Sequence, residues 1–582
     1  MIKNLNSETQ AKISSDYIII GSGAAGITIA LELSSHGKNV IILESGELKI
    51  INEIQELNHG KILVNGAVFN DNFDGTANKY SQSAFDFASQ KSFSVDLEMT
   101  RELLKRRNRV FGGGTTFDVS SPHGKGWSGE CKKLDSIDFE YRDWIPNSGW
   151  PYSKSNLEPY YRRAHKLLKL GPINSSAEDL WSSDKDYYKK YEFCKTKIRY
   201  ILRQFSNQGN AKPNQWKDRV RFGIDFYEIV RQSYNISAYI NATVINLNCD
   251  ERGEAVRSVT ALTREGKKIE ISGKFFILAA GAIESTRLLL LSNNIKKNGL
   301  GNEYDLVGRF FNDYVICQIG TISANDPNRL GKLFSERPKY ANTRASTGLR
   351  ISEEVQKDEK ILNCSAYIFV DLRGDSPIES LVRLYVALKN GSYKEIKIRD
   401  FFNIARAIPH LVKQIYRRFR GFDLAQSFDS KAVVLCQVQQ AISHESRIFL
   451  SDNLDKYDKN EVIVDSKIGY LERKTAKTFA LIIKQECERL GIGEFVAADF
   501  VNDESVEFCD SISTPMAGHP CGSTRMSESR YNGVVDPDCK VYGLTNLFIS
   551  SSSVMPTSGC TDVTFTIVAL ALKLADHLNK IE

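Results

Sequence analysis

Three glycines and one glutamate near the N-terminus have the spacing of a dinucleotide-binding site. Gly21, Gly23 and Gly26 form the pattern Gly-x-Gly-x-x-Gly directly after an apolar, β-branched run at 17–20. Gly21 permits a tight turn, Gly23 lets backbone approach a pyrophosphate, and Gly26 lets the next helix pack closely on its strand. Glu44 ends a second apolar run, where a carboxylate can accept hydrogen bonds from a ribose. The pattern predicts an adenine dinucleotide, and it does not choose between NAD and FAD because both contain ADP-ribose.

Two further stretches of small residues could lie against a large flat ligand. Gly113 and Gly114 belong to a run of three adjacent glycines, whose N–H groups can point at a ring edge or a phosphate. Gly281 follows two alanines after an apolar strand that begins near Lys274. Taken alone, the first stretch is also typical of a flexible turn and the second of a tight strand-to-helix connection. Neither stretch identifies a ligand without the rest of the chain.

The composition limits the classes of protein to which this chain can belong. The chain has 582 residues, of which 42% are hydrophobic and 25% charged, as in ordinary soluble proteins. Its net charge of +6 is small for this length, so we expect no nucleic-acid partner. No apolar run reaches the ~18 residues of a membrane span, and residues 1–15 lack the apolar core of a signal peptide. The 11 cysteines include no Cys-x-x-Cys pair, so we predict no metal site, reduced thiols and a cytoplasmic location.

Hydrophobic periodicity predicts a mixed α/β order of elements. We expect strands at 17–20, 40–43, 363–371, 383–389, 432–450 and 547–549, with antiparallel strands between 234 and 264. Helices are expected at 24–35, from about 153 to 170, after 281, and at 399–420, 472–490 and about 561–578. Residues 47–95 are polar and weakly periodic, so they predict a long loop that acts as a lid or covers the cofactor.

The predicted helix at 399–420 is basic and amphipathic. Arg406, Lys413 and Arg417 lie among apolar residues such as Phe402 and Leu411. Such a helix can lie on a membrane surface or bind a partner. It is more often a surface helix with one solvated face, and Pro409 interrupts this one. Both interpretations stay open from the sequence.

Together these segments resemble the glucose–methanol–choline (GMC) oxidoreductases, flavoproteins that oxidise alcohols. The likeness covers nearly the whole chain and is greatest to bacterial members that act on sugars and polyols. The motifs that carry it are Gly21-x-Gly23-x-x-Gly26 with Glu44, Arg109-Val-Phe-Gly-Gly-Gly, Ala280-Gly-Ala-Ile-Glu-Ser-Thr-Arg-Leu-Leu, His519-x-x-Gly522-Ser-Thr-Arg-Met, and Gly533-Val-Val-Asp with Pro556-Thr-Ser-Gly and Thr566-Ile-Val-Ala-Leu-Ala. Each motif is modestly specific, and their shared order is strongly so.

The resemblance implies that the cofactor is FAD and that the fold class is α/β. An FAD-binding, Rossmann-like domain would be built from 13–149, 220–314 and 506–582. An α+β substrate domain with a largely antiparallel sheet would comprise 150–219 and 315–505. The residues implied to contact FAD beyond the first motif are Gly113, Gly114, Val244, Gly281, Ser552, Pro556 and Thr557. Val244 would lie near the adenine, and Ser552, Pro556 and Thr557 near the ribityl chain and ring.

The reaction implied by the resemblance is hydride transfer from an alcohol carbon to flavin N5. The base that removes the hydroxyl proton matches His519, because imidazole accepts protons near neutral pH. The second active-site position, usually His or Asn in the family, is Asp562 here, which puts the proton chemistry in doubt. Asp562 could instead cap the last helix, since Asp is a favoured N-cap. His444 is a weaker alternative as base.

Two other functions share the same scaffold. Some relatives keep FAD structurally and cleave cyanohydrins as lyases, and a non-catalytic FAD-binding protein would keep the cofactor without turnover. The retention of His519 argues against the second. The small-molecule alcohol is not identified by the sequence, and the electron acceptor could be oxygen, a quinone or a protein.

We predict that FAD is bound without a covalent link. Covalent attachment needs a His, Cys or Tyr beside the flavin, and the stretch 109–121 offers none, although His123 lies just beyond it. Acid precipitation of the purified protein should therefore leave the yellow colour in the supernatant. Colour that stays in the pellet would contradict the prediction.

Overall fold

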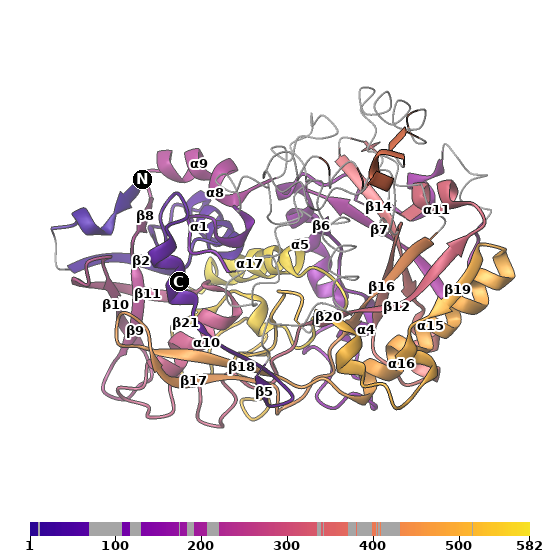
Figure 1. Ribbon diagram of the computed structural model, residues 1–582. Coiled ribbons are helices and arrows are strands. Elements are labelled where there is room, and N and C mark those ends of the chain that lie inside the picture. Colours follow the sequence, from indigo (N-terminus) through magenta and orange to yellow (C-terminus); the bar gives the residue numbers. More distant parts are fainter. Residues whose placement is uncertain are drawn as a thin grey trace.

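The computed structural model describes most of the chain in two large halves (Figure 1). The described residues are 1–9, 12–68, 107–116, 130–173, 175–182, 191–206, 220–334, 339–341, 343–370, 431–514 and 516–581, together with 380, 384, 398–402, 404, 405 and 408. Within these ranges, no helix combines the length and the hydropathy needed to cross a membrane.

Eight of the described strands form the first sheet, in the order β1-β8-β3-β2-β11-β10-β9, with β21 also paired to β11. Their bounds are β1 Ile2–Asn4, β2 Lys12–Ile20, β3 Val40–Leu43, β8 Ile236–Ile240, β9 Thr243–Cys249, β10 Val256–Leu262, β11 Lys268–Leu278 and β21 Leu547–Ile549. The central pairs are parallel. Parallel strands are covered on both faces, which is why β3 is buried at every position and reads as a continuous apolar run.

The first strand–helix–strand unit follows the sequence closely. Helix α1 spans Ala24–Ser35 and β3 spans Val40–Leu43, as their apolar patterns predict. The alternating stretch after 234 differs from expectation in one strand. β9 and β10 are antiparallel, but β8 pairs in parallel with β3 and β1. An alternating apolar and polar pattern indicates that one face of a strand is buried. It does not indicate the direction of the neighbouring strand, so it cannot distinguish parallel from antiparallel pairing.

Nine of the described strands form the second sheet, in the order β19-β12-β16-β15-β14-β7-β6, with β13 paired to β14 and β20 to β12. Their bounds are β6 Glu130–Cys131, β7 Ile198–Phe205, β12 Tyr314–Ala324, β13 Lys339–Tyr340, β14 Thr343–Ile351, β15 Cys364–Val370, β16 Lys431–Gln439, β19 Gly493–Ala497 and β20 Ile512–Thr514. The strand pairs described in this sheet are all antiparallel. Helix α15 (Tyr470–Leu490) packs along this sheet on the right of Figure 1.

A smaller sheet joins distant parts of the chain. It contains β17 (Arg447–Leu454), β18 (Asn460–Ser466), β4 (Gly60–Val64) and β5 (Ala67–Val68), and β18 runs parallel to β4. The sequence places this hairpin within the expected substrate domain at 315–505. In the structure it pairs instead with the segment that follows the dinucleotide motif.

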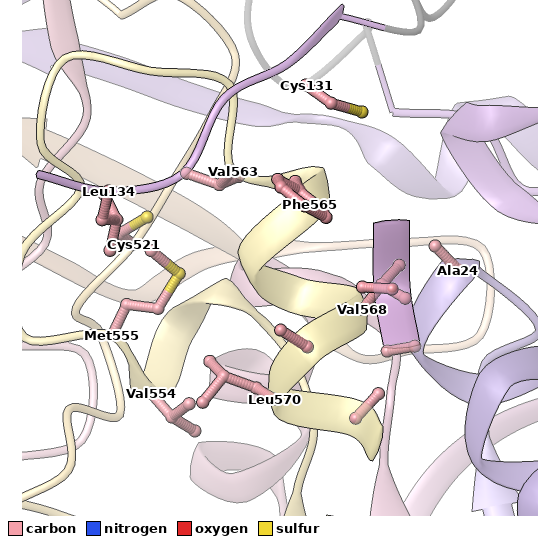
Figure 2. Close-up of a cluster of buried hydrophobic side chains, with 14 of the residues drawn as sticks. Ala24, Cys131, Leu134, Cys521, Val554, Met555, Val563, Phe565, Val568 and Leu570 are labelled. Carbon is pink, nitrogen blue, oxygen red and sulfur yellow. The ribbon is translucent and has the colours of Figure 1, made fainter. Parts of the chain in front are cut away.

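Helix α17 (Thr564–Leu578) lies between the two large sheets, beside α1 and α5 (Figure 1). Its sequence is apolar on most sides, so it is buried along nearly its whole length. Figure 2 shows Phe565, Val568 and Leu570 in the surrounding core. Phe565 packs on the ring of Tyr161, with centroids 5.1 Å apart. This packing fixes where the chain just before the helix must lie.

The remaining described helices are short or peripheral. They are α2 Asn52–Gln55, α4 Ser136–Phe139, α5 Lys154–Leu167, α6 Ala177–Leu180, α8 Phe222–Asp225, α9 Tyr227–Gln232, α10 Gly281–Leu291, α11 Pro327–Phe334, α12 Glu353–Asp358 and α16 Asp499–Asn502, with 3₁₀ turns at Leu5–Ser7, Glu56–Asn58, Gly113–Thr115, Phe508–Ser511 and Ser552–Val554. Helix α5 begins after a capping box at Ser153, as the sequence predicts.

Several expectations fall wholly or partly outside the described residues. Most of the lid expected at 47–95 and of the basic helix at 399–420 lies there, together with His123. In the strand expected at 383–389 the one described residue, Leu384, is helical, so a strand is wrong at that position. The described residues of 399–408 are helical, and whether this helix touches a membrane stays a prediction.

Candidate active site

A cavity of about 420 Å³ runs between the first sheet, the small sheet and the C-terminal loops, a volume typical of small-molecule sites. The predicted site residues in its wall are Gly21, Gly23, Glu44, Gly113, Gly114, Val244, Gly281, His519 and Ser552. These residues are hundreds of positions apart in the sequence. The fold therefore brings most of the predicted cofactor site to one place.

The first glycine motif has different steric demands at each position. A Cβ on Gly26 would lie 2.0 Å from the carbonyl oxygen of Gly21, whereas a Cβ on Gly23 would meet no atom within 4 Å. Gly26 thus permits contact between α1 and its strand, and it lies outside the cavity wall for this reason. Gly23 is the N-cap of α1, where unpaired N–H groups and the helix dipole favour an anion.

Ser22 links the two glycine clusters to the acidic residue. Its N–H and hydroxyl donate to Glu44 Oε2 at 3.1 and 2.6 Å, while Oε1 of Glu44 accepts from Gly46 N at 2.8 Å. The hydroxyl of Ser22 in turn accepts from Gly112 N at 3.1 Å. Gly112 has φ +88, and a Cβ there would meet Thr116 Oγ1 at 1.8 Å, so only glycine fits. Gly114 has open space at its Cβ position.

A charged cluster lines the other wall of the cavity. Glu284, in the first turn of α10, pairs with Arg107 and lies 2.8 Å from Arg109 and 3.6 Å from Arg287. Arg287 also bonds Asp455 of the β17–β18 hairpin at 2.7 Å. Burial favours the neutral acid, but the charges of Arg109, Arg107 and Arg287 outweigh it and hold the pKa of Glu284 well below its usual value. The cluster ties the segment at 107–109, helix α10 and the β17–β18 hairpin together.

His519 and Asp562 meet at the end of the cavity beneath the antiparallel sheet. His519 Nε2 lies 3.5 Å from Asp562 Oδ1. The hydroxyl of Tyr314 donates to the same Oδ1 at 3.0 Å, and its ring stacks on the imidazole with centroids 5.2 Å apart. Among the described residues, the buried Nδ1 of His519 has no hydrogen-bond partner.

A second carboxylate, Asp313, holds the backbone of this loop. Its Oδ2 accepts from Gly518 N at 3.0 Å and His519 N at 2.9 Å, and its Oδ1 accepts from Tyr314 N at 2.7 Å. Burial raises the pKa of Asp313, while the charge of His519 and these three N–H groups act in the opposite direction. The orientation of His519 thus depends on the first residues of β12.

Comparison with known proteins then identifies two parts of the chain. Residues 444–571 match the GMC oxidoreductase family model, and residues 16–51 match an FAD-binding domain. The C-terminal part is thus a GMC oxidoreductase domain. The cofactor is FAD.

Individual relatives are distant. The fructose dehydrogenase large subunit of Gluconobacter japonicus is 20% identical over 97% of this chain and 98% of its own. A dehydrogenase of Armillaria gallica is 36% identical over 84 residues, 14% of this chain and 13% of its own. The structure of pyridoxine 4-oxidase from Mesorbium loti has a TM-score of 0.52 at 16% identity and covers 98% of this chain and 100% of its own. At this identity the structural likeness shows the fold alone.

Three predicted site residues are placed differently from expectation in this chain. Pro556 and Thr557 lie outside the cavity wall. Thr557 is fully buried; its hydroxyl donates to Asp138 O and accepts from Trp150 Nε1, both at 2.9 Å. Asp562 is also absent from the wall, and it is not the helix cap, because the N-cap of α17 is Val563, without a side-chain bond. His444 lies beside Arg309, away from the cavity.

Sequence reasoning missed Asp313, Tyr314 and the charged cluster around Glu284. Asp313 and Tyr314 begin a buried strand more than 200 positions before His519, so no local spacing connects them. The only local signal is an acidic residue directly before a long apolar strand. Glu284 and Arg287 have helical i, i+3 spacing, but nothing in that spacing indicates Arg107 or Arg109.

Gly26→Ala and Gly23→Ala should separate folding from cofactor binding. The methyl of Gly26→Ala would clash with Gly21 O, so overpacking should destabilise the fold by ~1–3 kcal/mol. Gly23→Ala has room for its methyl but places it where a pyrophosphate approaches, so the apoprotein should keep its Tm and bind FAD ~10-fold or more weakly. Thermal melts with and without FAD measure both. Equal loss of apoprotein Tm in the two variants would contradict this assignment.

Glu284→Gln should remove much of the stability that the charged cluster provides. Three arginines would remain without their shared acid, and breaking a buried pair typically costs ~3–5 kcal/mol. Because the folded-state pKa of Glu284 is lowered from 4.5, its contribution is present above about pH 4.5 and is lost as the pH falls further. The Tm difference from the wild type should therefore be large at pH 7 and shrink below pH 4.5.

The matched control is Glu228→Gln. Glu228 forms an exposed i, i+3 pair with Arg231, and exposed pairs contribute little to stability. Its Tm should follow that of the wild type at both pH values. A Glu284→Gln Tm as high as that of Glu228→Gln at pH 7 would show that the cluster is not stabilising.

Proposed function

We propose that this protein is a GMC oxidoreductase that oxidises a CH–OH group of a sugar, polyol or related alcohol, with His519 as the base. The observation that carries the proposal is the contact at 3.5 Å between Asp562 Oδ1 and Nε2 of His519, which lines the cavity. Oxidation of an alcohol needs a group that takes the hydroxyl proton, and an oriented imidazole is suited to that task.

The contact with Asp562 also assigns the tautomer of His519. A carboxylate beside Nε2 favours a proton on that nitrogen, which leaves the lone pair on Nδ1. Nδ1 is buried and has no partner within the described part of the chain. We assign His519 as the group that receives the substrate proton. Asp562 then orients the ring and stabilises the imidazolium that forms, as the acid of a catalytic triad does.

The residues of the cavity fit FAD. Gly23 and Gly114 leave open space where a side chain would project, the α1 N-terminus suits a pyrophosphate, and Glu44 stands where a ribose is bound in such folds. Val244, Gly281 and Ser552 complete the wall in this proposal. FAD, when bound, supplies the acceptor for the hydride of the alcohol carbon.

Polar side chains also lie near Asp562, outside the cavity wall. Ser365 on β15 donates to the carbonyl of Cys560 at 3.4 Å, two residues before Asp562. Gln437 on β16 accepts from Ser365 and from Tyr367. The names of two relatives, fructose dehydrogenase and pyridoxine 4-oxidase, refer to a sugar and to another polar alcohol.

The domain division stays part of the proposal. We propose an FAD domain from 13–149, 220–314 and 506–582 and a substrate domain from 150–219 and 315–505. The β17–β18 hairpin would be reassigned to the FAD side, because it pairs with β4 and contributes Asp455 to the cavity wall.

Anaerobic mixing with a panel of sugars and polyols tests the reaction. An oxidoreductase bleaches its own flavin with a substrate, whereas a lyase or a non-catalytic flavoprotein does not. Subsequent addition of oxygen, a quinone or an artificial acceptor shows which acceptor restores the oxidised spectrum. A flavin that no alcohol reduces would overturn the proposal.

His519→Ala should lower the turnover rate by ~10²–10⁴-fold, the usual range for a lost general base, while FAD stays bound.

Asp562→Asn should move the acidic limb of the kcat/KM profile to lower pH, because the charge that favours the imidazolium is removed. Its effect on stability should be small, since Asp562 is not the cap of α17. His444→Ala, at an exposed histidine away from the cavity, is the matched control. Near-normal turnover in His519→Ala would rule out this base.

A further inference from the structure

We propose that Tyr314 is a positioning residue that sets the strength of the base by sharing the carboxylate of Asp562 with His519. This inference rests on the proposed function, because it assigns Tyr314 a role only through the His519–Asp562 pair. Tyr314 lies on the sheet side of that pair, and its position was not marked by any motif in the sequence.

The geometry gives Tyr314 two contacts with the pair. Its hydroxyl donates to Asp562 Oδ1 at 3.0 Å, the same oxygen that lies 3.5 Å from His519 Nε2. Its ring lies nearly parallel to the imidazole, with an interplanar angle of 16°. The ring therefore limits how the imidazole tilts, while the hydroxyl takes up part of the acceptor capacity of one carboxylate oxygen.

The hydroxyl of Tyr314 can act only as a donor toward that carboxylate. The side chain is 2% exposed, and burial raises the pKa of Tyr314 well above its usual value, with the charge of Asp562 adding to the shift. The phenol thus keeps its proton throughout the working pH range. A neutral donor partly compensates the carboxylate charge, so less of that charge is available to stabilise an imidazolium.

Tyr314 and His519 are also fixed to one another through the backbone. Asp313 accepts from the amides of both residues, at 2.7 and 2.9 Å. The ring stack and the shared carboxylate are thus built on one common anchor. Among the described residues, the titratable groups in contact with residue 519 are Asp313 directly before β12, Tyr314 on β12, Asp562 before α17, and Cys521 in its own loop.

The direction of the pH shift in Tyr314→Phe follows from the carboxylate that Tyr314 and His519 share. Removal of the hydroxyl takes one donor away from Asp562 Oδ1, so the carboxylate holds the imidazole proton more strongly. Tyr314→Phe should therefore move the acidic limb of the kcat/KM profile to higher pH. This direction is opposite to that expected for Asp562→Asn. A merely structural tyrosine would not shift the limb.

A double-mutant cycle tests whether Tyr314 acts through Asp562. The proteins are the FAD-loaded wild type, Tyr314→Phe, Asp562→Asn and the double variant. In the double variant the limb should match Asp562→Asn alone, because the carboxylate that the hydroxyl modulates is gone. Tyr161→Phe is the control, since Tyr161 is fully buried and its hydroxyl contacts Thr566 at 2.9 Å, away from the pair. It should leave the pH profile unchanged.

A chemical readout independent of turnover follows His519 directly. Diethylpyrocarbonate acylates unprotonated imidazole, and mass spectrometry of the peptide that contains residue 519 measures the rate at each pH. The half-point of that rate should move to higher pH in Tyr314→Phe, as the activity limb does. Site-specific incorporation of 3-fluorotyrosine at 314 keeps the size and the hydroxyl but makes a stronger donor, so both half-points should move to lower pH.

Two results would overturn the role of Tyr314. One is a kcat/KM profile in Tyr314→Phe that matches the wild type. The other is a shift by Tyr314→Phe that is as large in the Asp562→Asn background as in the wild type. If Tyr314→Phe does not retain FAD, the fluorotyrosine protein decides by the same criterion. Failure of the proposed function has a different signature. In that case His519→Ala keeps its turnover whatever residue stands at 314.

Discussion

The buried carboxylate of Asp313 is the contact on which the active-site arrangement depends. Asp313 lies directly before strand β12 of the antiparallel sheet, and it joins that strand to the loop that carries His519. A buried carboxylate is costly unless it is hydrogen-bonded, and here three backbone N–H groups satisfy it. Separation of the loop from the sheet would leave the Asp313 carboxylate and these N–H groups without partners. Because that would cost free energy, these hydrogen bonds keep the sheet and the loop together. His519 is consequently positioned by the contact between the two halves of the chain and not by either half alone.

The cofactor wall is organised by a different constraint, which is close approach of backbone to backbone. Gly26 meets Gly21, and Gly112 meets Gly223, at distances that no Cβ could occupy. Ser22 then links the two glycine clusters to Glu44 through hydrogen bonds. On the opposite wall, ion pairs join separate parts of the chain, because Glu284 and Arg287 of α10 pair with Arg107, Arg109 and Asp455. Steric fit and ion pairing thus enclose the same cavity from two sides.

The parts of this structure that the sequence predicts are those determined by neighbouring residues. The β2–α1–β3 unit, the capping box at Ser153 and strand β21 follow from local periodicity and capping chemistry. The parallel pairing of β8 and the pairing of β18 with β4 depend on partners far along the chain, which local patterns do not encode. His519 and Asp562 are proposed from family likeness, and the structure places His519 Nε2 3.5 Å from Asp562 Oδ1. Tyr314 and Asp313 had no comparable signal.

The cofactor wall and the surroundings of His519 are built in different ways. The glycine motifs must satisfy tight steric limits, so the cofactor wall tolerates few changes. The groups around His519 come from β12, from the loop after β20 and from the residues before α17. Each can change without disturbing the glycine contacts. Tyr314 Oη and His519 Nε2 both lie close to one oxygen of Asp562, so a substitution at either residue changes the surroundings of the other. The surroundings of His519 can therefore vary while the glycine contacts that shape the cofactor wall stay the same.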